Sequence, residues 1–560
     1  MLFTTRLGMR LKRLFCKLHI NKRVKTVLVA FITCCIVIIL CTVNSYHNSM
    51  DGSSTLFDIS SWFLNADSLK IDTVKFGDYA TIFESLAKSK PQTRPLVQYK
   101  KENPKIQRFQ DDNEKFTIEY LSSLLKVSEH AKSKLKESYH KYMGLLGKRK
   151  LPIYGSFHDG EIKGKGIVMV GGGKFSWLAL LNIHQLRKVG SNLPVEVYIP
   201  VKRDYDETFC SEILTDLNAR CVLGYEDLPL SEVKSYFRHN RFQHKSMAIL
   251  ASKFEDILLL DADNVVTQAP DGLFNWDTYK EFQLVLWPDC WVRTTNPFIY
   301  ELFGIKLGEP PQNALYDLHQ LPGAIPNPST ESGMMLINKK THANTMLLAL
   351  YMNMYGLDYF YPLITQGGAG EGDKDTYITA AFALNQPVYQ VQYGVNFVGS
   401  FDYDGAFTSG GLGQCNPMDK IERYIHDRHI TTEKCPDYMF IHMNHPKYYP
   451  DEIADNFITN KGRYFLEFEN INLKDDYDFE LQIWEILTQL LCDGRRPNDE
   501  QPHNPASNPL DPKYLLSARG MRYIKSLKMD KICKSKILPR LQFLRGQFKV
   551  KEEKKNNKGQ

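Results

Sequence analysis

The first 50 residues of this 560-residue chain contain no aspartate and no glutamate. They carry eight lysine and arginine residues, more than the net charge of +6 of the whole chain. The remainder therefore has a small negative net charge. A nucleic-acid-binding body is expected to show a basic face. The distribution of charge thus argues against nucleic acid as a partner.

The sequence also lacks any Cys-x-x-Cys pair, which excludes a zinc ribbon. Beyond residue 50 the sequence has no Asn-x-Ser/Thr glycosylation site. Seven of the eleven cysteines lie in this part of the chain. In an oxidising compartment some of these cysteines pair, and proximity favours Cys210–Cys221 and Cys415–Cys435. Seven is an odd number, so at least one thiol is free or bonded to another chain.

Residues 26–45 are free of charge over a length of twenty residues, and no second apolar run of comparable length occurs in the chain. A helix of this length spans roughly 30 Å, the thickness of a bilayer core. All nearby positive charges precede the run, and such charges stay on the cytoplasmic side. The pattern predicts a cytoplasmic basic tail over 1–25 and a single-pass transmembrane anchor over 26–45. A cleaved signal peptide, the alternative, usually has a shorter apolar region.

The rest of the chain divides into three segments by composition. Residues 46–150 are polar with helical periodicity near the end, which predicts a lumenal stem that becomes helical. A coiled-coil dimerisation stem is the alternative, although the heptads are poor. We expect a globular body over 151–495. Residues 496–560 form a Pro/Asn-rich linker and a basic C-terminal extension.

The body opens with a βαβ pattern. A strand over 166–170 and a glycine triplet precede a helix over 175–189, and a second strand covers 195–199. Further along, the pattern predicts a helix over 245–252 and strands over 256–260 and 284–287. This alternation is typical of an α/β fold with a mostly parallel sheet flanked by helices.

Two aspartates follow the most apolar of these strands. Asp261 and Asp263 come directly after Ile257–Leu260. Open α/β sheets bind their ligands at the carboxyl ends of strands. Two carboxylates one residue apart suit a divalent cation that keeps positions open for phosphate oxygens. The motif favours an enzyme that uses a sugar-nucleotide diphosphate, and the alternative is an Asp-rich turn.

Six motifs occur in order over residues 160–450, in the segments 166–177, 244–252, 258–264, 287–295, 331–342 and 370–376. Together they resemble the fungal Golgi α-mannosyltransferases that build outer-chain mannan. The resemblance is to the α-1,2-mannosyltransferases that add branches to an α-1,6-mannose backbone. It implies a GT-A-like catalytic domain over 151–495, Mn²⁺, GDP-mannose as the donor and a type II topology in the Golgi membrane.

The resemblance suggests the metal ligands. Asp263 is the first, Asp261 is either a second ligand or a ribose and water-mediated contact, and His442 is the third. His442 follows a short apolar strand over 438–441, and its alternative role is that of a structural histidine. Lys447 would then reach a phosphate of the donor.

The resemblance also suggests contacts to the donor. Lys245 holds a phosphate or a carboxylate, unless it is a solvated lysine at a helix start. Ser332 and Gly333 let the mannose approach the backbone, unless they form a turn before a strand over 334–337. Three glycines lie under the guanosine, unless they form only a tight turn: Gly171, Gly172 and Gly173.

Two carboxylates are candidates for catalysis. Asp373 and Asp375 precede a helix expected over 376–384, where aspartates ordinarily cap the helix. GDP-mannose is α-linked and the implied product is α-linked, so configuration is retained. Retention needs a carboxylate nucleophile or attack from the leaving-group face. We favour the second route, with one aspartate orienting the acceptor. Four further residues line an acceptor groove or belong to the core: Trp287, Asp289, Trp291 and Arg293.

The resulting hypothesis is a Golgi enzyme that transfers mannose from GDP-mannose to mannan outer chains of N-glycans, forming α-1,2 branches. An α-1,3-mannosyltransferase of the related capping type is one alternative. A non-catalytic glycan-binding scaffold subunit is another. The expected partners are glycoprotein acceptors, the membrane and other Golgi mannosyltransferases in a complex.

Overall fold

The computed structural model describes these residues: 79–96, 115–148, 162–224, 241–312, 314–401, 404–419, 438–445, 447–452, 466–467, 478–493 and 517–547. The chain divides into a unit of residues 1–68 and a unit of residues 69–560, and all described residues belong to the second. The expected tail and anchor lie outside the described residues. Within the described ranges, no helix has the length and apolarity needed to cross a bilayer.

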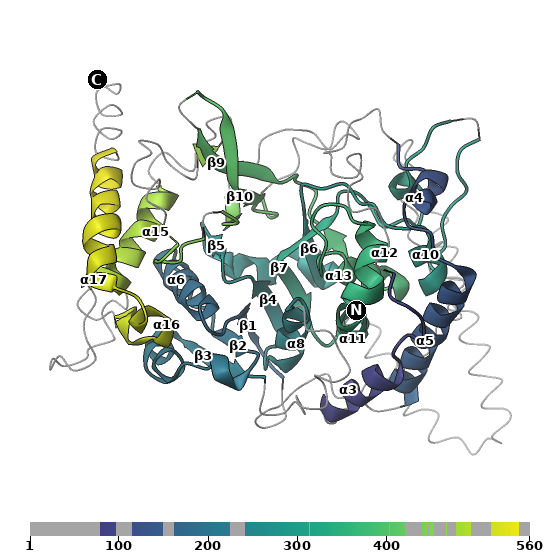
Figure 1. The fold of residues 1–560 in the computed structure, drawn as a ribbon, viewed down its shortest axis with the longest axis horizontal. Coiled ribbons are helices and arrows are strands. Elements are labelled where there is room, and N and C mark those ends of the chain that lie inside the picture. Colours follow the sequence, from purple (N-terminus) through teal and green to yellow (C-terminus); the bar gives the residue numbers. More distant parts are fainter. Residues whose placement is uncertain are drawn as a thin grey trace, which may run out of the picture. The chain divides into compact units, whose positions relative to one another are not determined.

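A seven-stranded sheet forms the centre of the fold, in the order β3-β2-β1-β4-β7-β6-β8 (Figure 1). Neighbouring strands pair in parallel except that β7 is antiparallel to β4 and β6, which confirms a mostly parallel sheet. The strands are β1 (Lys165–Val170), β2 (Val195–Ile199), β3 (Ala219–Leu223), β4 (Asp256–Leu260), β6 (Leu284–Pro288), β7 (Thr330–Asn338) and β8 (Tyr389–Gln390).

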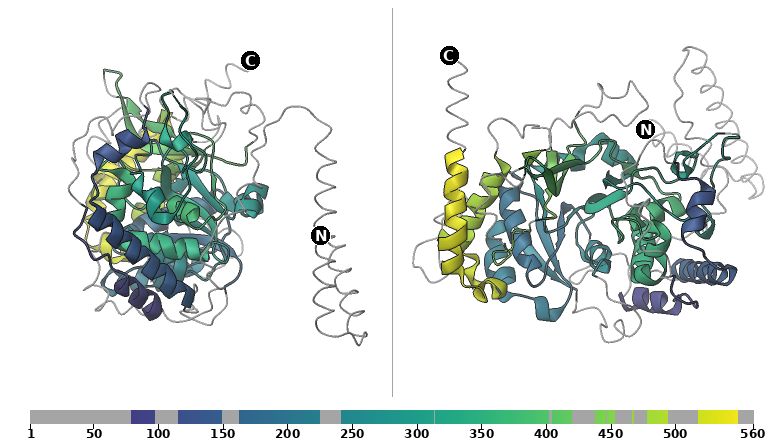
Figure 2. Two further views of the ribbon diagram at one scale, coloured as in Figure 1. Left: turned by 90° about the vertical axis from the view of Figure 1, so that its right-hand side faces the viewer. Right: turned by 45° about the horizontal axis from the view of Figure 1, so that its top comes forward.

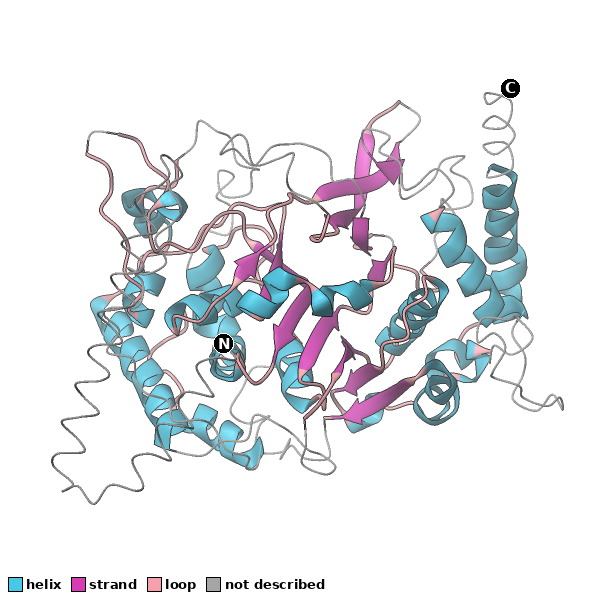
Figure 3. Ribbon diagram, turned by 180° about the vertical axis from the view of Figure 1, so that it is seen from behind, coloured by secondary structure: helices cyan, strands magenta, loops and turns pink. Residues whose placement is uncertain are grey.

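Both faces of this sheet are covered by helices (Figure 3). Alternate residues of β4 enter different hydrophobic clusters: Leu258 and Leu260 on one face, Ile257 and Leu259 on the other. Burial on both faces explains why the strand is apolar throughout. The first face packs against α6 (Phe175–Lys188) and α15 (Phe479–Thr488). The second packs against α8 (Gln243–Ala251), α11 (Ala343–Met354) and α13 (Thr376–Ala383).

A second sheet of five strands has the order β12-β9-β10-β11-β5. Its strands are β5 (Asn264–Val266), β9 (Asn396–Phe401), β10 (Phe407–Cys415), β11 (Tyr438–His442) and β12 (Leu466–Glu467). β5 follows β4 after only three residues and pairs antiparallel with β11, so that His442 lies opposite Asn264. The pairing brings the end of β11 to the carboxyl end of β4.

The helical end of the expected stem packs against the body. α3 (Tyr79–Lys88), α4 (Ile118–Leu124) and α5 (Glu129–Lys148) share a hydrophobic cluster with α11. Tyr142 stacks on Tyr351 with 4.7 Å between ring centroids, and its hydroxyl donates to the carbonyl oxygen of Leu347 over 2.9 Å. The remaining short helices are α9 (Asp277–Phe282), α10 (Phe298–Phe303), α12 (Tyr361–Thr365), α16 (Arg522–Lys525) and α17 (Met529–Ile532).

The C-terminal helices lie beside α15 in Figure 1 and in the right-hand view of Figure 2, and belong to the same hydrophobic cluster. Arg540 forms a buried ion pair with Glu480 over 2.6 Å. Arg522 donates to the carbonyl oxygens of Arg203 (2.7 Å) and Tyr205 (2.6 Å). The basic extension is therefore docked on the body over residues 517–547.

The disulfides agree in part with the sequence-based expectation. Cys210–Cys221 is confirmed. Cys492–Cys533 joins α15's end to the C-terminal helices and was not predicted. Cys435, the expected partner of Cys415, lies outside the described residues. Cys290 is the free thiol among the described cysteines.

Candidate active site

The Asp-Ala-Asp turn leaves the central sheet at the end of β4. The amide of Asp261 donates to the carbonyl oxygen of Gly333 over 2.8 Å, and the amide of Asn264 closes the turn on Asp261 over 2.9 Å. The side-chain amide of Asn264 adds a 2.7 Å hydrogen bond to the same Gly333 oxygen. Because β4 also pairs with β1, Met169 opposite Leu260, the glycine triplet leaves the sheet at the same edge.

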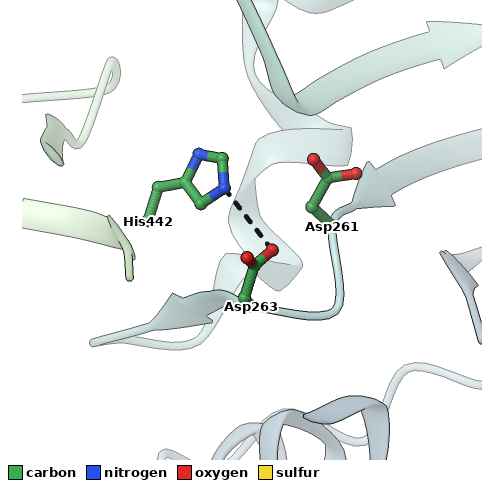
Figure 4. Close-up of side chains that lie close together, drawn as sticks. All are labelled: Asp261, Asp263 and His442. Carbon is green, nitrogen blue, oxygen red and sulfur yellow. Dashed lines mark ion pairs between the residues drawn. The ribbon is translucent and has the colours of Figure 1, made fainter. Parts of the chain in front are cut away.

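Three ligand atoms from Asp261, Asp263 and His442 lie within 4.8 Å of one another. Nε2 of His442 is 3.4 Å from Oδ1 of Asp263, and Asp261 stands across from both (Figure 4). The structure thus brings together all three expected metal ligands, although His442 comes from β11. Carboxylate and imidazole donors suit Mn²⁺, so the residues present fit that ion.

Glu331 lies behind the histidine. Its Oε1 is 3.6 Å from Nδ1 of His442 and accepts a 2.7 Å hydrogen bond from the amide of Gly333. Burial raises the pKa of Glu331, but the charge of His442 and of Lys245 outweighs it and lowers the pKa to about 2. Burial lowers the pKa of His442, and Glu331 reverses the direction and raises it. A carboxylate on Nδ1 leaves Nε2 directed at the metal position, a common arrangement around metal-binding histidines.

The sequence alone did not single out Glu331 for this role. Glu331 begins the 331–342 motif, but the strand expected from the sequence begins only at Met334. In the structure β7 begins at Thr330, so Ser332 and Gly333 are in the strand and not in a turn. The register of β7 against β6 shifts between Leu286 and Trp287, which marks a bulge at this end of the sheet.

Lys245 connects two carboxylates. From the first turn of α8 its Nζ donates to Oδ2 of Asp261 over 2.8 Å and lies 3.8 Å from Oδ2 of Asp373. Ser332 accepts from it at both Oγ and the carbonyl oxygen, each over 3.0 Å. Burial lowers the pKa of Lys245, but the two aspartates outweigh it and raise the pKa. With 15% of its side chain exposed, Lys245 is not a solvated surface lysine.

The two candidate catalytic aspartates have different surroundings. Asp373 accepts from Ser332 Oγ over 3.2 Å and from the Tyr377 hydroxyl over 3.4 Å. Burial raises the pKa of Asp373 to about 6, against the opposing charge of Lys245. The carboxylate therefore belongs to the cluster around Asp261.

Asp375 lies outside this cluster. Its Oδ1 is 2.7 Å from Nη1 of Arg293 and accepts from both the amide and the hydroxyl of Thr330 over 2.8 Å. Burial raises the pKa of Asp375, but Arg293 and Lys374 outweigh it and lower the pKa. Asp375 also makes no side-chain capping bond to α13. The contacts of Asp375 are those of a structural ion pair.

Lys447 and the glycine triplet flank the Asp-Ala-Asp turn. Lys447 forms an ion pair with Oδ2 of Asp263, and burial lowers the pKa of Lys447. Gly172 and Gly173 have φ of +99° and +56°, values that glycine adopts readily. Their amides donate to Ser176 Oγ over 3.0 Å and to the Asp204 carbonyl oxygen over 3.1 Å.

These amides therefore have partners within the protein, which favours the tight-turn alternative for the triplet. Gly171 is restricted by packing, since a Cβ there would lie 2.5 Å from Val197 Cγ1. Three of the acceptor-groove candidates are likewise buried and engaged. Trp287 packs on Phe440 with 5.4 Å between ring centroids, Arg293 pairs with Asp375, and Asp289 pairs with Lys374 over 2.7 Å.

Comparison with known proteins gives the family. Residues 164–418 match the Mannosyl_trans3 family of mannosyltransferases. The chain is 34% identical over 516 residues to alpha-1,2-mannosyltransferase MNN2 of Candida albicans, covering 84% of this chain and 83% of that protein. The chain belongs to the fungal α-1,2-mannosyltransferase family. It is also 31% identical to MNN2 of Saccharomyces cerevisiae, over 81% of this chain and 85% of that protein.

Among solved structures, the galactosyltransferase LgtC has a TM-score of 0.26 and 13% identity, covering 41% of this chain and 74% of that one. Within the α-1,2-mannosyltransferase chain, the Mannosyl_trans3 match includes Asp261, Asp263 and Asp373 but ends before His442 and Lys447. The pairing of β11 with β5 is what carries His442 to the site.

Proposed function

We propose that this chain transfers mannose from GDP-mannose to mannan outer chains of N-glycans, forming α-1,2 branches with retention of configuration. The observation that carries the proposal is the group of Asp261, Asp263 and His442, which has a lysine on either side, in a chain of this family. We also propose a GT-A-like domain behind a membrane anchor over 26–45, with the body in the Golgi lumen.

Asp261, Asp263 and His442 would hold Mn²⁺, which when bound neutralises the charge that develops on the departing diphosphate. Glu331 orients the imidazole so that Nε2 is the ligand atom. Lys245 fixes the carboxylate of Asp261 through its 2.8 Å contact. Lys447, paired here with Asp263, is a cation that can turn to a donor phosphate when the carboxylate is shared with a metal.

Asp373 is the carboxylate that we assign to the acceptor side. It is 3.8 Å from Lys245, which itself contacts Asp261, so it lies one side chain beyond the metal ligands. In attack from the leaving-group face, a diphosphate oxygen takes the proton of the acceptor hydroxyl. Asp373 then orients that hydroxyl and stabilises positive charge at the anomeric carbon.

The test is transfer by the full-length chain. The protein is incubated with GDP-mannose, Mn²⁺ and an α-1,6-linked mannan, and the product linkages are analysed. We expect new α-1,2-linked mannose, lost on chelation of the metal and in Asp263→Asn. Asp277→Asn, which changes an exposed aspartate on α9, is the matched control and should retain transfer.

Each alternative has a distinct outcome in the same test. α-1,3-linked product would indicate the capping type of enzyme. A chain that binds mannan but transfers nothing, with Asp263→Asn equal to wild type, would indicate a glycan-binding scaffold. Transfer that persists undiminished in a chelator would contradict the metal-dependent mechanism.

A further inference from the structure

One exposed aromatic ring stands next to the candidate site. Phe242 is 38% exposed and is one of four exposed large apolar residues in the described part of the chain, with Leu315, Phe401 and Leu538. It precedes the first residue of α8, and Lys245, in the first turn of that helix, contacts Asp261 and approaches Asp373. The ring is therefore attached to the same helix start as a lysine of the site.

The segment Gly370-Glu371-Gly372 packs between two aromatic side chains. A Cβ on Gly372 would lie 3.2 Å from Cε1 and Cζ of Phe242. A Cβ on Gly370 would lie 2.3 Å from Nζ of Lys374 and 3.1 Å from Cδ1 of Trp291. Gly372 thus allows the Phe242 ring to contact the backbone directly, and Gly370 leaves room for both Lys374 and Trp291. The next residue of the chain is Asp373.

The orientation of the Phe242 ring is set by its neighbour Tyr361. The two rings meet edge to face, with 5.8 Å between centroids and 88° between planes. Glu371, between Gly370 and Gly372 in the chain, is half-buried and accepts from the Thr365 hydroxyl over 2.9 Å. A carboxylate has about four lone-pair sites, so Glu371 can accept from a ligand hydroxyl as well.

These groups match the chemistry of a hexose. A pyranose ring has a face of C–H groups, which carry partial positive charge and pack on the negative face of an aromatic ring. Its hydroxyls donate to carboxylates. Aromatic rings beside a segment that carries a carboxylate therefore suit a sugar. Lys374, the cation beside Gly370, is already paired with Asp289 over 2.7 Å.

The position distinguishes the acceptor from the donor. Donor phosphates would lie at Asp261, Asp263 and His442. Lys245 and Asp373 come next, and Phe242 contacts Gly372, the residue before Asp373. We infer that Phe242, Trp291 and the Gly370–Asp373 segment form the binding subsite for the acceptor mannose. The inference rests on the proposed function and adds the residues that recognise the acceptor.

The experiment compares Phe→Ala changes at two positions of equal exposure in the full-length chain. Phe242→Ala should raise the KM for an α-1,6-linked mannose acceptor about tenfold, or about 1.4 kcal/mol, and leave the KM for GDP-mannose unchanged. Phe242→Tyr retains the ring and should keep the acceptor KM near that of wild type. Phe401→Ala, at 37% exposure on β9, is the control and should have no effect.

Release of GDP without acceptor provides a second measurement, in which the control Phe401→Ala should equal wild type. An unchanged acceptor KM in Phe242→Ala would overturn the inference. So would an equal rise in Phe401→Ala, or a rise confined to the KM for GDP-mannose. If the wild-type chain itself transfers no mannose, the proposed function fails instead, and the two failures are thereby distinguished.

Discussion

Replacing Gly333 by alanine should weaken the metal site without unfolding the protein. Gly333 lies in β7 and its φ is not positive, so the backbone accepts a side chain. The added Cβ would lie 2.8 Å from Nδ1 and 3.0 Å from Cε1 of His442, and 3.1 Å from Oε1 of Glu331. Ordinary contacts begin at 3.4 Å. The imidazole therefore has to move by about 0.6 Å to restore normal contact.

A displacement of that size is large for a metal ligand. Distances in metal sites are held to roughly 0.2 Å, and supporting contacts keep ligands within about 0.5 Å of their working positions. Loss of such support typically lowers metal affinity or activity about 10- to 100-fold. This corresponds to about 1.4–2.8 kcal/mol. Because Asp261 and Asp263 remain in place, binding should be weakened and not abolished.

The assay is the initial rate of mannose transfer as a function of Mn²⁺ concentration. Gly333→Ala should need a 10- to 100-fold higher concentration for half-maximal rate, with much of the rate recovered at saturation. Gly394→Ala is the control, since a Cβ there would meet nothing within 4 Å. A folded Gly333→Ala protein with wild-type Mn²⁺ dependence would refute the assignment of His442 as a ligand held by β7.

Three further predictions concern buried charges. Asp373→Asn should abolish transfer and should raise the Tm, because it removes a carboxylate whose ionised form is disfavoured by burial. Burial raises the pKa of Asp373 to about 6, so the kcat/KM of the wild type should fall as the pH drops through about 6. Asp375→Asn should lower stability by about 3 kcal/mol in denaturant unfolding, because Arg293 loses its buried partner. Burial lowers the pKa of Lys339 from 10.5 to about 7, so the unfolded chain binds the proton of this lysine more tightly than the folded chain does. The free energy of unfolding should therefore rise between pH 7 and 10.5, by up to about 1.4 kcal/mol per pH unit. Urea unfolding at pH 7.5 and 9.5 should show a smaller rise for Lys339→Met, and equal rises would contradict the assignment.

The sequence predicted the strands of the parallel part of the sheet well. β2 and β4 have the expected bounds, and β1 and β6 differ by one residue at one end. Their apolar runs are short, are covered on both faces and end in polar or glycine residues, so the local pattern suffices. The aspartates after β4 could be placed for the same reason, whereas His442 was assigned as a ligand through the family resemblance.

The roles of residues that depend on partners far away in the sequence could not be predicted. Asp373 and Asp375 are equivalent in sequence, and the difference between them comes from Arg293 and Lys245, about 80 and 130 residues away. Hydrogen bonds within the protein occupy the amides of the glycine triplet, which no motif reveals. The helices of the expected stem read as amphipathic, but only the packing of Tyr142 and its neighbours shows that they join the body.

The contacts of Arg522 bear on how this protein can be shortened for study. Arg522 donates to the carbonyl oxygens of Arg203 and Tyr205. Asp204, between these two residues, accepts a hydrogen bond at its carbonyl oxygen from the turn after β1. A chain cut at residue 495 would remove the guanidinium and leave Cys492 without Cys533. A protein shortened to residue 495 for crystallisation would thus lose contacts that hold the segment bonded to the glycine turn. A protein that extends to residue 547 would keep these contacts.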